Sequence, residues 1–142
     1  MKKHLMIFRR DGRILHQGKL KNIVTCASVG AAYKGQSYII RAIARLDRQG
    51  LQYHYHLYGG GNPQRLKDLV HKLGVEQYVH FHGLVAHEKI MECIKGMDIY
   101  AQPSLQEGLP RSVIEAMSVG LPVMTSSDVG GIETSCTPPN MR

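Results

Sequence analysis

The chain has 142 residues, which is the length of one domain and too few for two. Its composition is that of a globular protein, with 43% hydrophobic and 20% charged residues. No apolar run approaches the ~18 residues that span a bilayer, so we do not expect an integral membrane protein. The formal net charge of +7 raises the question of a nucleic-acid partner.

That charge is concentrated in residues 1–21, which we call the basic lead. It holds seven Lys and Arg residues and one Asp, while the other 121 residues carry 11 basic and 10 acidic side chains. We therefore expect no nucleic-acid binding by the domain behind it. The basic lead has two interpretations. It is either a linker or edge strand, or a peripheral membrane contact in which residues 5–8 supply the apolar side chains.

The cysteines indicate a reducing compartment. Cys26, Cys93 and Cys136 are far apart, and no CxxC pair or zinc-finger spacing links them. The apolar run at residues 5–8 is too short for a signal peptide. We expect a cytoplasmic protein, with peripheral association at the inner membrane face as the alternative.

From residue 22 onward, short apolar runs alternate with helical periodicity. We predict strands at residues 22–29, 53–58, 78–82, 99–101 and 122–125, and helices beginning near residues 37, 63, 87 and 110. Residues 134–142 show neither pattern and are expected to form an irregular tail. We therefore predict one domain at residues 22–133, in a chain that stops before its fold is complete.

Strict alternation of strand and helix predicts an α/β fold, a Rossmann-like parallel sheet with helices on both faces. In such folds, ligands bind beyond the carboxyl ends of the strands. The loops that follow the strands are therefore the places to look for function.

The loop after the fourth strand carries the clearest chemical signal. Gly108 permits close approach of a ligand, and the backbone amides of Leu109, Arg111 and Ser112 precede or open a helix, where phosphate binds well. Glu107 and Glu115 can both reach the same cleft and accept hydrogen bonds from sugar hydroxyls. The alternative is that both are ordinary solvated acids, although Glu115 lies within an apolar helical segment.

The sequence resembles a known family through several motifs in the same order. They are Tyr33-Lys34-Gly35, Gly59-Gly60-Gly61, residues 79–83, residues 107–110, Glu115-Ala116-Met117, residues 120–123 and residues 130–133. Together they resemble the donor-binding half of retaining glycosyltransferases of family 4, which have the two-domain GT-B fold. The resemblance covers roughly residues 22–133.

The resemblance implies a role for individual residues. Glu107 would hold hydroxyls of the donor sugar, and Glu115 would bind the ribose. Gly108 and Leu109 would offer amides to the distal phosphate, while Lys34 would neutralise the diphosphate as it departs. A basic residue that usually precedes this lysine is replaced by Ala31.

The three consecutive glycines allow more than one interpretation. Gly59, Gly60 and Gly61 would admit the nucleotide to the sheet edge, or they would simply close a loop. A nicotinamide-binding fingerprint is not expected, because Gln64 occupies the third glycine position and no acid follows at the required distance.

The resemblance also implies what the chain needs. Its substrate would be a nucleotide-diphosphate sugar and its acceptor a glycan or lipid-linked glycan, with no cofactor and no metal. GT-B enzymes place the acceptor site on a second domain, so we expect the chain alone to bind donor without efficient transfer. A non-catalytic nucleotide-sugar-binding module and a nucleotide-sugar epimerase remain alternatives.

Two histidine pairs raise the question of a metal site. His54 with His56, and His80 with His82, each share one face of a predicted strand and could in principle chelate a metal. No acid or cysteine completes either set, so we favour a structural role for them.

Overall fold

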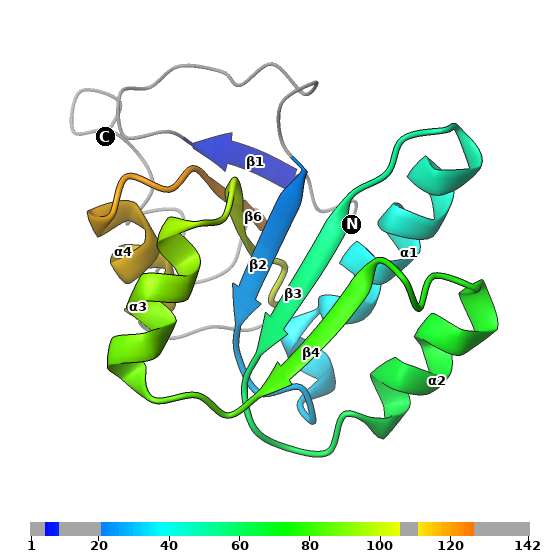
Figure 1. Ribbon diagram of the computed structural model, residues 1–142, viewed down its shortest axis with the longest axis horizontal. Helices are drawn as coiled ribbons and strands as arrows, with labels where there is room; N and C mark the ends of the chain where they lie inside the picture. Colours follow the sequence, from blue (N-terminus) through cyan, green and yellow to red (C-terminus); the bar gives the residue numbers. More distant parts are fainter. Residues whose placement is uncertain (1–4, 9–20, 106–110, 127–142) are drawn as a thin grey trace.

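The computed structural model describes residues 5–8, 21–105 and 111–126, which form a six-stranded sheet flanked by helices (Figure 1). In chain order the elements are β1 (Leu5–Phe8), β2 (Asn22–Cys26), α1 (Gln36–Arg48), β3 (His54–Tyr58), α2 (Gln64–Leu73), β4 (Val79–Gly83), α3 (His87–Lys95), β5 (Ile99–Gln102), α4 (Arg111–Ser118) and β6 (Val123–Ser126). A short 3-10 turn at Ala32–Lys34 lies between β2 and α1.

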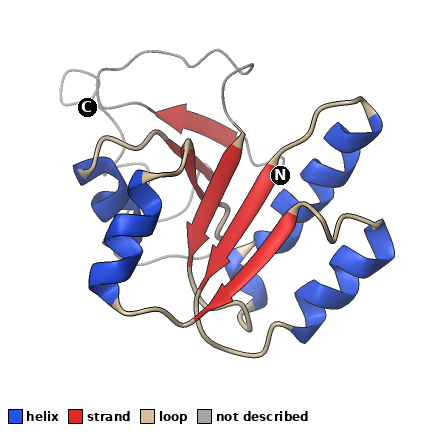
Figure 2. Ribbon diagram, in the orientation of Figure 1, coloured by secondary structure: helices blue, strands red, loops and turns tan. Residues whose placement is uncertain are grey.

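The sheet has the order β1-β6-β5-β2-β3-β4, and the pairings among β2 to β6 are all parallel. β2 lies between β3 and β5, with Asn22 opposite His54 and Ile23 opposite Ile99. The predicted Rossmann-like α/β fold is therefore confirmed. Figure 2 shows the parallel strands pointing toward the same edge, where their connecting loops gather.

Two apolar cores lie on opposite faces of the sheet because alternate residues of a strand point to opposite sides. On β2, Ile23 belongs to the core with α1 and α2, whereas Val24 belongs to the core with α3 and α4. Tyr55 and Tyr100 are fully buried, one in each core. The helices thus cover both faces, as the sequence predicts.

Helix ends follow the glycine and asparagine signals closely. α1 ends at Arg48, and two residues later Gly50 adopts φ +78° while its amide donates to the carbonyl of Asp47. α2 ends at Leu73 with Gly74 at φ +68°. Just before α2, the Asn62 side chain accepts a hydrogen bond from the Gln64 amide at 3.0 Å, where Gln64 is the first residue of the helix.

One predicted strand boundary differs from the structure by more than one residue. β2 ends at Cys26 rather than at residue 29, because the chain turns there to meet the loop of residues 59–61, which we call the glycine loop. The amides of Ala27 and Val29 donate to the carbonyls of Tyr58 and Gly60.

β1 pairs antiparallel with β6, so part of the basic lead belongs to the sheet as an edge strand. None of the described helices is long and apolar enough to cross a membrane. The predicted tail at residues 134–142 lies outside the described residues.

The α1 core gives a direct test of the fold. Ile40 is fully buried, and replacing it with alanine should lower the free energy of unfolding by about 2–5 kcal/mol, because a cavity replaces the lost contacts. Ile114→Ala is the matched control, since that side chain is 44% exposed and should cost clearly less. Urea unfolding measures both. Equal losses would show that the α1 core is wrongly placed.

Candidate functional site

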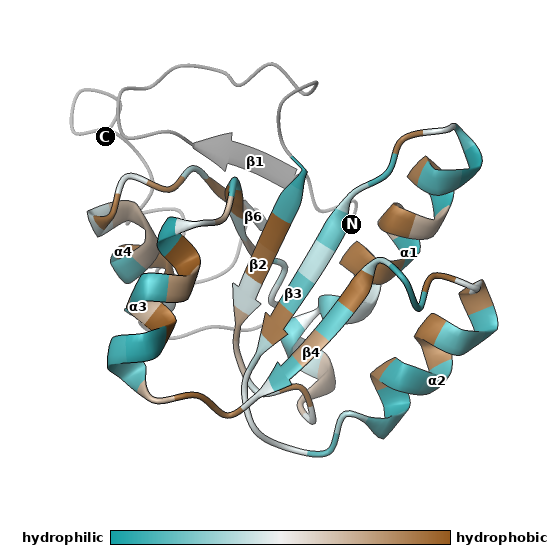
Figure 3. Ribbon diagram, in the orientation of Figure 1, coloured by the Kyte–Doolittle hydropathy of each residue, from teal (hydrophilic) through white to brown (hydrophobic). Residues whose placement is uncertain are grey.

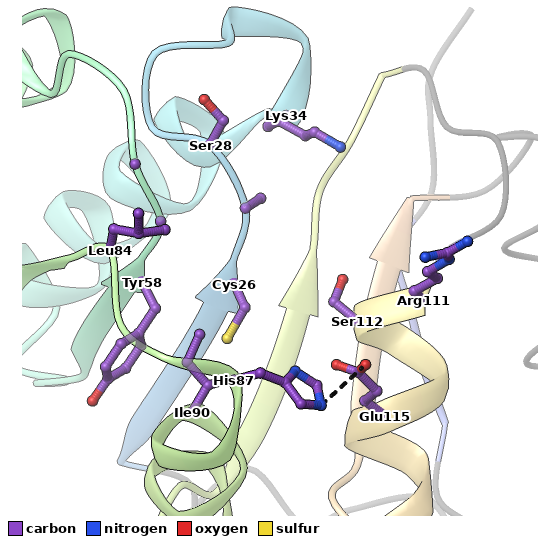
Figure 4. Close-up of a pocket in the computed structure, with 13 residues that line it drawn as sticks. Cys26, Ser28, Lys34, Tyr58, Leu84, His87, Ile90, Arg111, Ser112 and Glu115 are labelled. Carbon is purple, nitrogen blue, oxygen red and sulfur yellow. Dashed lines mark ion pairs between the residues drawn. The ribbon is translucent and has the colours of Figure 1, made fainter.

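A cleft of about 470 Å³ opens at the carboxyl ends of β2 and β3, facing the start of α4 (Figure 4). In a parallel sheet this is the edge where ligands bind. Its walls come from three loops and two helices that are distant in sequence. The residues that line it are Cys26, Ala27, Ser28, Lys34, Tyr58, Gly59, Gly60, Leu84, His87, Ile90, Arg111, Ser112 and Glu115.

Lys34 is held at one side of the cleft by its backbone. The 3-10 turn that carries it is closed by two hydrogen bonds, in which the Lys34 amide donates to the Ala31 carbonyl and the Gly35 amide to the Ala32 carbonyl. The Leu105 amide then donates to the Tyr33 carbonyl at 2.7 Å, which ties this turn to the loop after β5. The ammonium also lies 5.2 Å from the centre of the Tyr33 ring. A cation is therefore fixed at the cleft wall.

A buried glutamine supports the same loop from beneath. Gln36 is fully buried at the start of α1, and its Nε2 donates to the Ser28 carbonyl at 3.0 Å. Gly35 adopts φ +75°, and a Cβ there would lie only 1.9 Å from the Pro103 carbonyl oxygen. Only glycine fits at this contact, so the sequence Lys34-Gly35-Gln36 reflects packing as well as charge.

The glycine loop follows β3 at the cleft, and the surroundings of its three residues differ. Gly59 adopts φ +151°, and a Cβ there would meet the Ala27 carbonyl oxygen at 1.9 Å. A Cβ on Gly61 would lie 2.9 Å from the Gly30 amide nitrogen, whereas Gly60 has only Leu84 within 4 Å. Gly59 and Gly60 line the cleft, and Gly61 lines a smaller hollow beside α2. The close approach of the loop after β2 thus explains why residues 59 and 61 are glycines. At Gly60 the wall of the cleft is open instead.

Glu115 lies on the second turn of α4 and points into the cleft toward α3 (Figure 4). Its Oε1 is 3.8 Å from Nε2 of His87, the first residue of α3. The Glu115 side chain is 39% exposed, so the interaction is screened and contributes little to stability. The carboxylate therefore keeps access to a ligand.

Cys26 lies on the cleft floor but is not a reactive thiol. Burial, followed by the nearby Glu115 carboxylate and Cys93, raises the pKa of Cys26 to about 12. The thiol therefore stays protonated at neutral pH and is a poor nucleophile. Cys93 packs against the α3 and α4 core, as its helical spacing predicts.

Several lining side chains were not predicted from the sequence. Arg111 and Ser112 were expected to offer only backbone amides, yet their side chains line the cleft together with Ser28, Leu84 and His87. Figure 4 shows Arg111 and Lys34 entering from different elements. All of these residues lie just after a strand or in the first turn of a helix, and this position is the signal that could have identified them.

Part of the predicted site lies outside the described residues. Glu107, Gly108 and Leu109 fall in the segment 106–110, so the structure places only Lys34, Glu115 and the glycine loop. Within the described ranges, no group of three or more His, Cys, Asp or Glu side chains is arranged to hold a metal ion.

Comparison with known proteins identifies the family. Residues 10–137 match the family model described as glycosyl transferases group 1. The chain belongs to this family. It is 29% identical over 103 residues to protein CapJ of Staphylococcus aureus, covering 72% of this chain and 26% of that protein.

Solved glycosyltransferase structures share the fold of this group 1 chain. WaaG, a glycosyltransferase involved in lipopolysaccharide biosynthesis, superposes with a TM-score of 0.72 at 26% identity, covering 84% of this chain and 32% of WaaG. Anabaena HepE, solved in complex with UDP-glucose, gives 0.70 at 26% identity, covering 82% of this chain and 32% of that one. The group 1 chain therefore spans about a quarter to a third of these relatives, and its sheet corresponds to one half of a GT-B glycosyltransferase.

The glycine loop of this group 1 chain gives a second test. Gly59→Ala should lower the free energy of unfolding by roughly 2–4 kcal/mol, because the new Cβ meets the Ala27 backbone in a strained conformation. Gly74→Ala is the control, because its φ is also positive but nothing lies within 4 Å of a Cβ there. That variant should cost about 1–2 kcal/mol. Urea unfolding compares the two, and equal costs would contradict the close approach of the loops.

Proposed function

We propose that this chain is the donor-binding part of a retaining hexosyltransferase, which takes a sugar from a nucleotide-diphosphate sugar to a glycan or lipid-linked acceptor. The observation that carries the proposal is the cleft at the carboxyl edge of the sheet, with cations at one end and the Glu115 carboxylate at the other (Figure 4). The UDP-glucose complex of Anabaena HepE supports a nucleotide sugar as the donor.

The cationic end would bind the diphosphate. Lys34 and Arg111 come from opposite sides of the cleft, and α4 begins at Arg111, so its first amides add to the same positive potential. As the bond between the sugar and the diphosphate breaks, negative charge grows on the departing phosphate oxygen. Fixed cations stabilise that charge more strongly than they stabilise the intact donor, and this difference lowers the barrier. No metal ion is required in this scheme.

The acidic end would bind the nucleoside. A carboxylate accepts hydrogen bonds from two neighbouring hydroxyls, so Glu115 suits the ribose. Glu107 would hold hydroxyls of the donor sugar, with Gly108 and Leu109 at the distal phosphate.

In the retaining reaction the acceptor attacks from the face that the diphosphate leaves. The acceptor itself would be bound by a part of the enzyme outside this donor half. Residues 5–8 of the basic lead pair with β6, so membrane contact would come from its basic side chains, which would bring a lipid-linked acceptor close to an anionic surface.

Glu115→Gln tests the nucleoside end. Loss of the charged acceptor should weaken binding of the preferred nucleotide sugar by roughly 10- to 100-fold, as measured by calorimetric titration against UDP-, GDP- and ADP-sugars. Glu92→Gln is the matched control, since that acid lies on the exposed side of α3 and pairs only with Lys95 among the ion pairs of the described residues. It should bind like the wild type.

A third variant separates the direct role of Glu115 from its contact with His87. His87→Gln should change the affinity by less than about fivefold, because the exposed pair contributes little. A folded wild-type chain that binds none of these nucleotide sugars would contradict the proposed function.

Lys34→Met tests the diphosphate end. It should weaken binding of the nucleoside diphosphate by roughly tenfold and leave the affinity for the corresponding nucleoside unchanged, because the nucleoside carries no charge for Lys34 to neutralise. Calorimetry at low and high salt measures both. Lys95→Met, on an exposed lysine paired with Glu92, is the control. Equal weakening of nucleoside and diphosphate by Lys34→Met would argue for a purely structural lysine.

A further inference from the structure

A continuous row of rings crosses the edge of the sheet and reaches the cleft only at its last member. We call His54, His56 and Tyr58 of β3 together with His80 and His82 of β4 the histidine ladder. Their rings alternate between the two strands, with centres 5.2 Å apart for His54 and His80, 4.8 Å for His80 and His56, 5.3 Å for His56 and His82, and 4.3 Å for His82 and Tyr58. Each neighbouring pair is stacked.

The strand period explains why these rings share a face. Tyr55 and Leu57 on β3, and Val79 and Phe81 on β4, pack with the core beneath α1 and α2. The residues between them must therefore point to the opposite side. Parallel pairing places His56 opposite His80 and so brings the two rows into contact. In Figure 3, β3 is largely coloured as hydrophilic, in contrast to the hydrophobic middle of β2.

Each hydrogen bond within the ladder requires at least one neutral imidazole. Nδ1 of His54 lies 2.9 Å from Nε2 of His80, and Nδ1 of His56 lies 3.0 Å from Nε2 of His82. One nitrogen of each pair must accept, so a pair with both rings protonated cannot keep its bond. Adjacent imidazolium ions would also repel each other at these separations.

The electrostatic setting favours the neutral rings. Burial, followed by the charges of His80, His82 and His54, lowers the pKa of His56 to about 4. Burial also lowers the pKa of His80, where His54 and His82 add to the effect, and burial lowers the pKa of His82.

The elements packed around the ladder offer little compensating charge. On β2, Asn22 Oδ1 lies 3.2 Å from His56 Nε2, and the Asp98 carboxylate behind it accepts from the Lys21 and Asn22 amides. The Lys21 ammonium lies over Tyr53, the residue before the ladder. On α3, the thiol facing Tyr58 is that of Cys93, and below the ladder the Tyr78 ring meets His54 edge-on.

The ladder ends at the cleft. Tyr58 stacks on His82 and lines the cleft, and the next residue, Gly59, donates its amide to the Gly83 carbonyl at 2.9 Å. The last bond between β3 and β4 is therefore also the bond that ties the glycine loop to β4, while the Ala27 and Val29 amides tie it to the loop after β2. Separation of β4 from β3 thus removes one of the contacts that support this wall of the cleft.

We propose that the histidine ladder is an acid-sensitive clasp, in which protonation of the imidazoles separates β4 from β3 and frees the glycine loop from its bond to β4. His56, His80 and His82, whose pKa values are lowered in the closed state, bind protons more readily in the unfolded or opened state. The stability contributed by neutral His56 is therefore complete above about pH 6.5 and is lost as the pH falls toward its pKa of about 4. Acidification thus loosens this edge of the cleft before the centre of the sheet.

Amide hydrogen exchange tests the clasp without any nucleotide, so its outcome is independent of the proposed function. Protection factors, corrected for intrinsic exchange, are compared at pH 7 and pH 5 in the presence of EDTA. The Gly59 amide should lose protection by roughly tenfold at pH 5, because opening of the β3–β4 edge exposes it. The Tyr100 amide, which donates to the Pro122 carbonyl in the centre of the sheet, should change by less than about threefold.

Variants connect that loss to the ladder. His56→Phe and, independently, His80→Phe keep an aromatic ring but cannot be protonated, so most of the acid-induced loss at Gly59 should disappear. His71→Phe, on an exposed α2 histidine outside the ladder, should behave like the wild type. Unchanged Gly59 protection in the wild type, or an equal loss in the ladder variants, overturns the proposal. A loss that occurs only without EDTA also overturns it and indicates metal binding instead.

Discussion

The parallel pairing of β2 with β3 on one side and β5 on the other is the constraint on which the rest of the structure depends. It brings the carboxyl ends of three strands to one edge, so that the loop bearing Lys34, the glycine loop and the start of α4 meet there. Buried hydroxyls reinforce the centre, because the Thr25 Oγ1 donates to the Ala101 carbonyl at 2.7 Å. The shared direction of the strands places a cleft at this edge of the sheet, whatever side chains line it.

Beneath the cleft, a network of buried polar groups links the ends of three strands. The Tyr100 hydroxyl accepts from the Cys26 amide at 3.1 Å and lies 3.1 Å from Gln102, whose Nε2 donates to Ser104. The Ser126 hydroxyl in turn donates to the Ser104 carbonyl. Such a network fixes the ends of β2, β5 and β6 relative to each other, because breaking one bond would leave a buried partner unsatisfied. The floor of the cleft at Cys26 is therefore held by hydrogen bonds between strands.

The outer edge of the sheet at β4 is built differently. β4 is the last strand of the order, and it is joined to β3 on one face by imidazoles rather than by aliphatic side chains. Apolar contacts are insensitive to pH, whereas imidazole pairs depend on it near neutrality. The same sheet thus combines a centre held by burial with an edge held by neutral histidines. The glycine loop joins the two, since Gly59 packs against the Ala27 backbone and bonds to Gly83.

The sequence by itself determined the succession of strands and helices along the chain from residue 22, and with it the Rossmann-like class. It also determined the position of Gly50 and Gly74 at helix ends. Both follow from the sequence because hydrophobic periodicity and glycine conformation are local properties. It also identified Lys34, Glu115 and the glycine loop as candidates. Only the tertiary structure decided that β1 joins the sheet, that β2 ends at Cys26, and that His87 and Arg111 share the cleft with them. These features depend on which segments meet across the sheet. The ladder is the clearest example, since the spacing of the histidines fixes their face but only the pairing of β3 with β4 makes them neighbours.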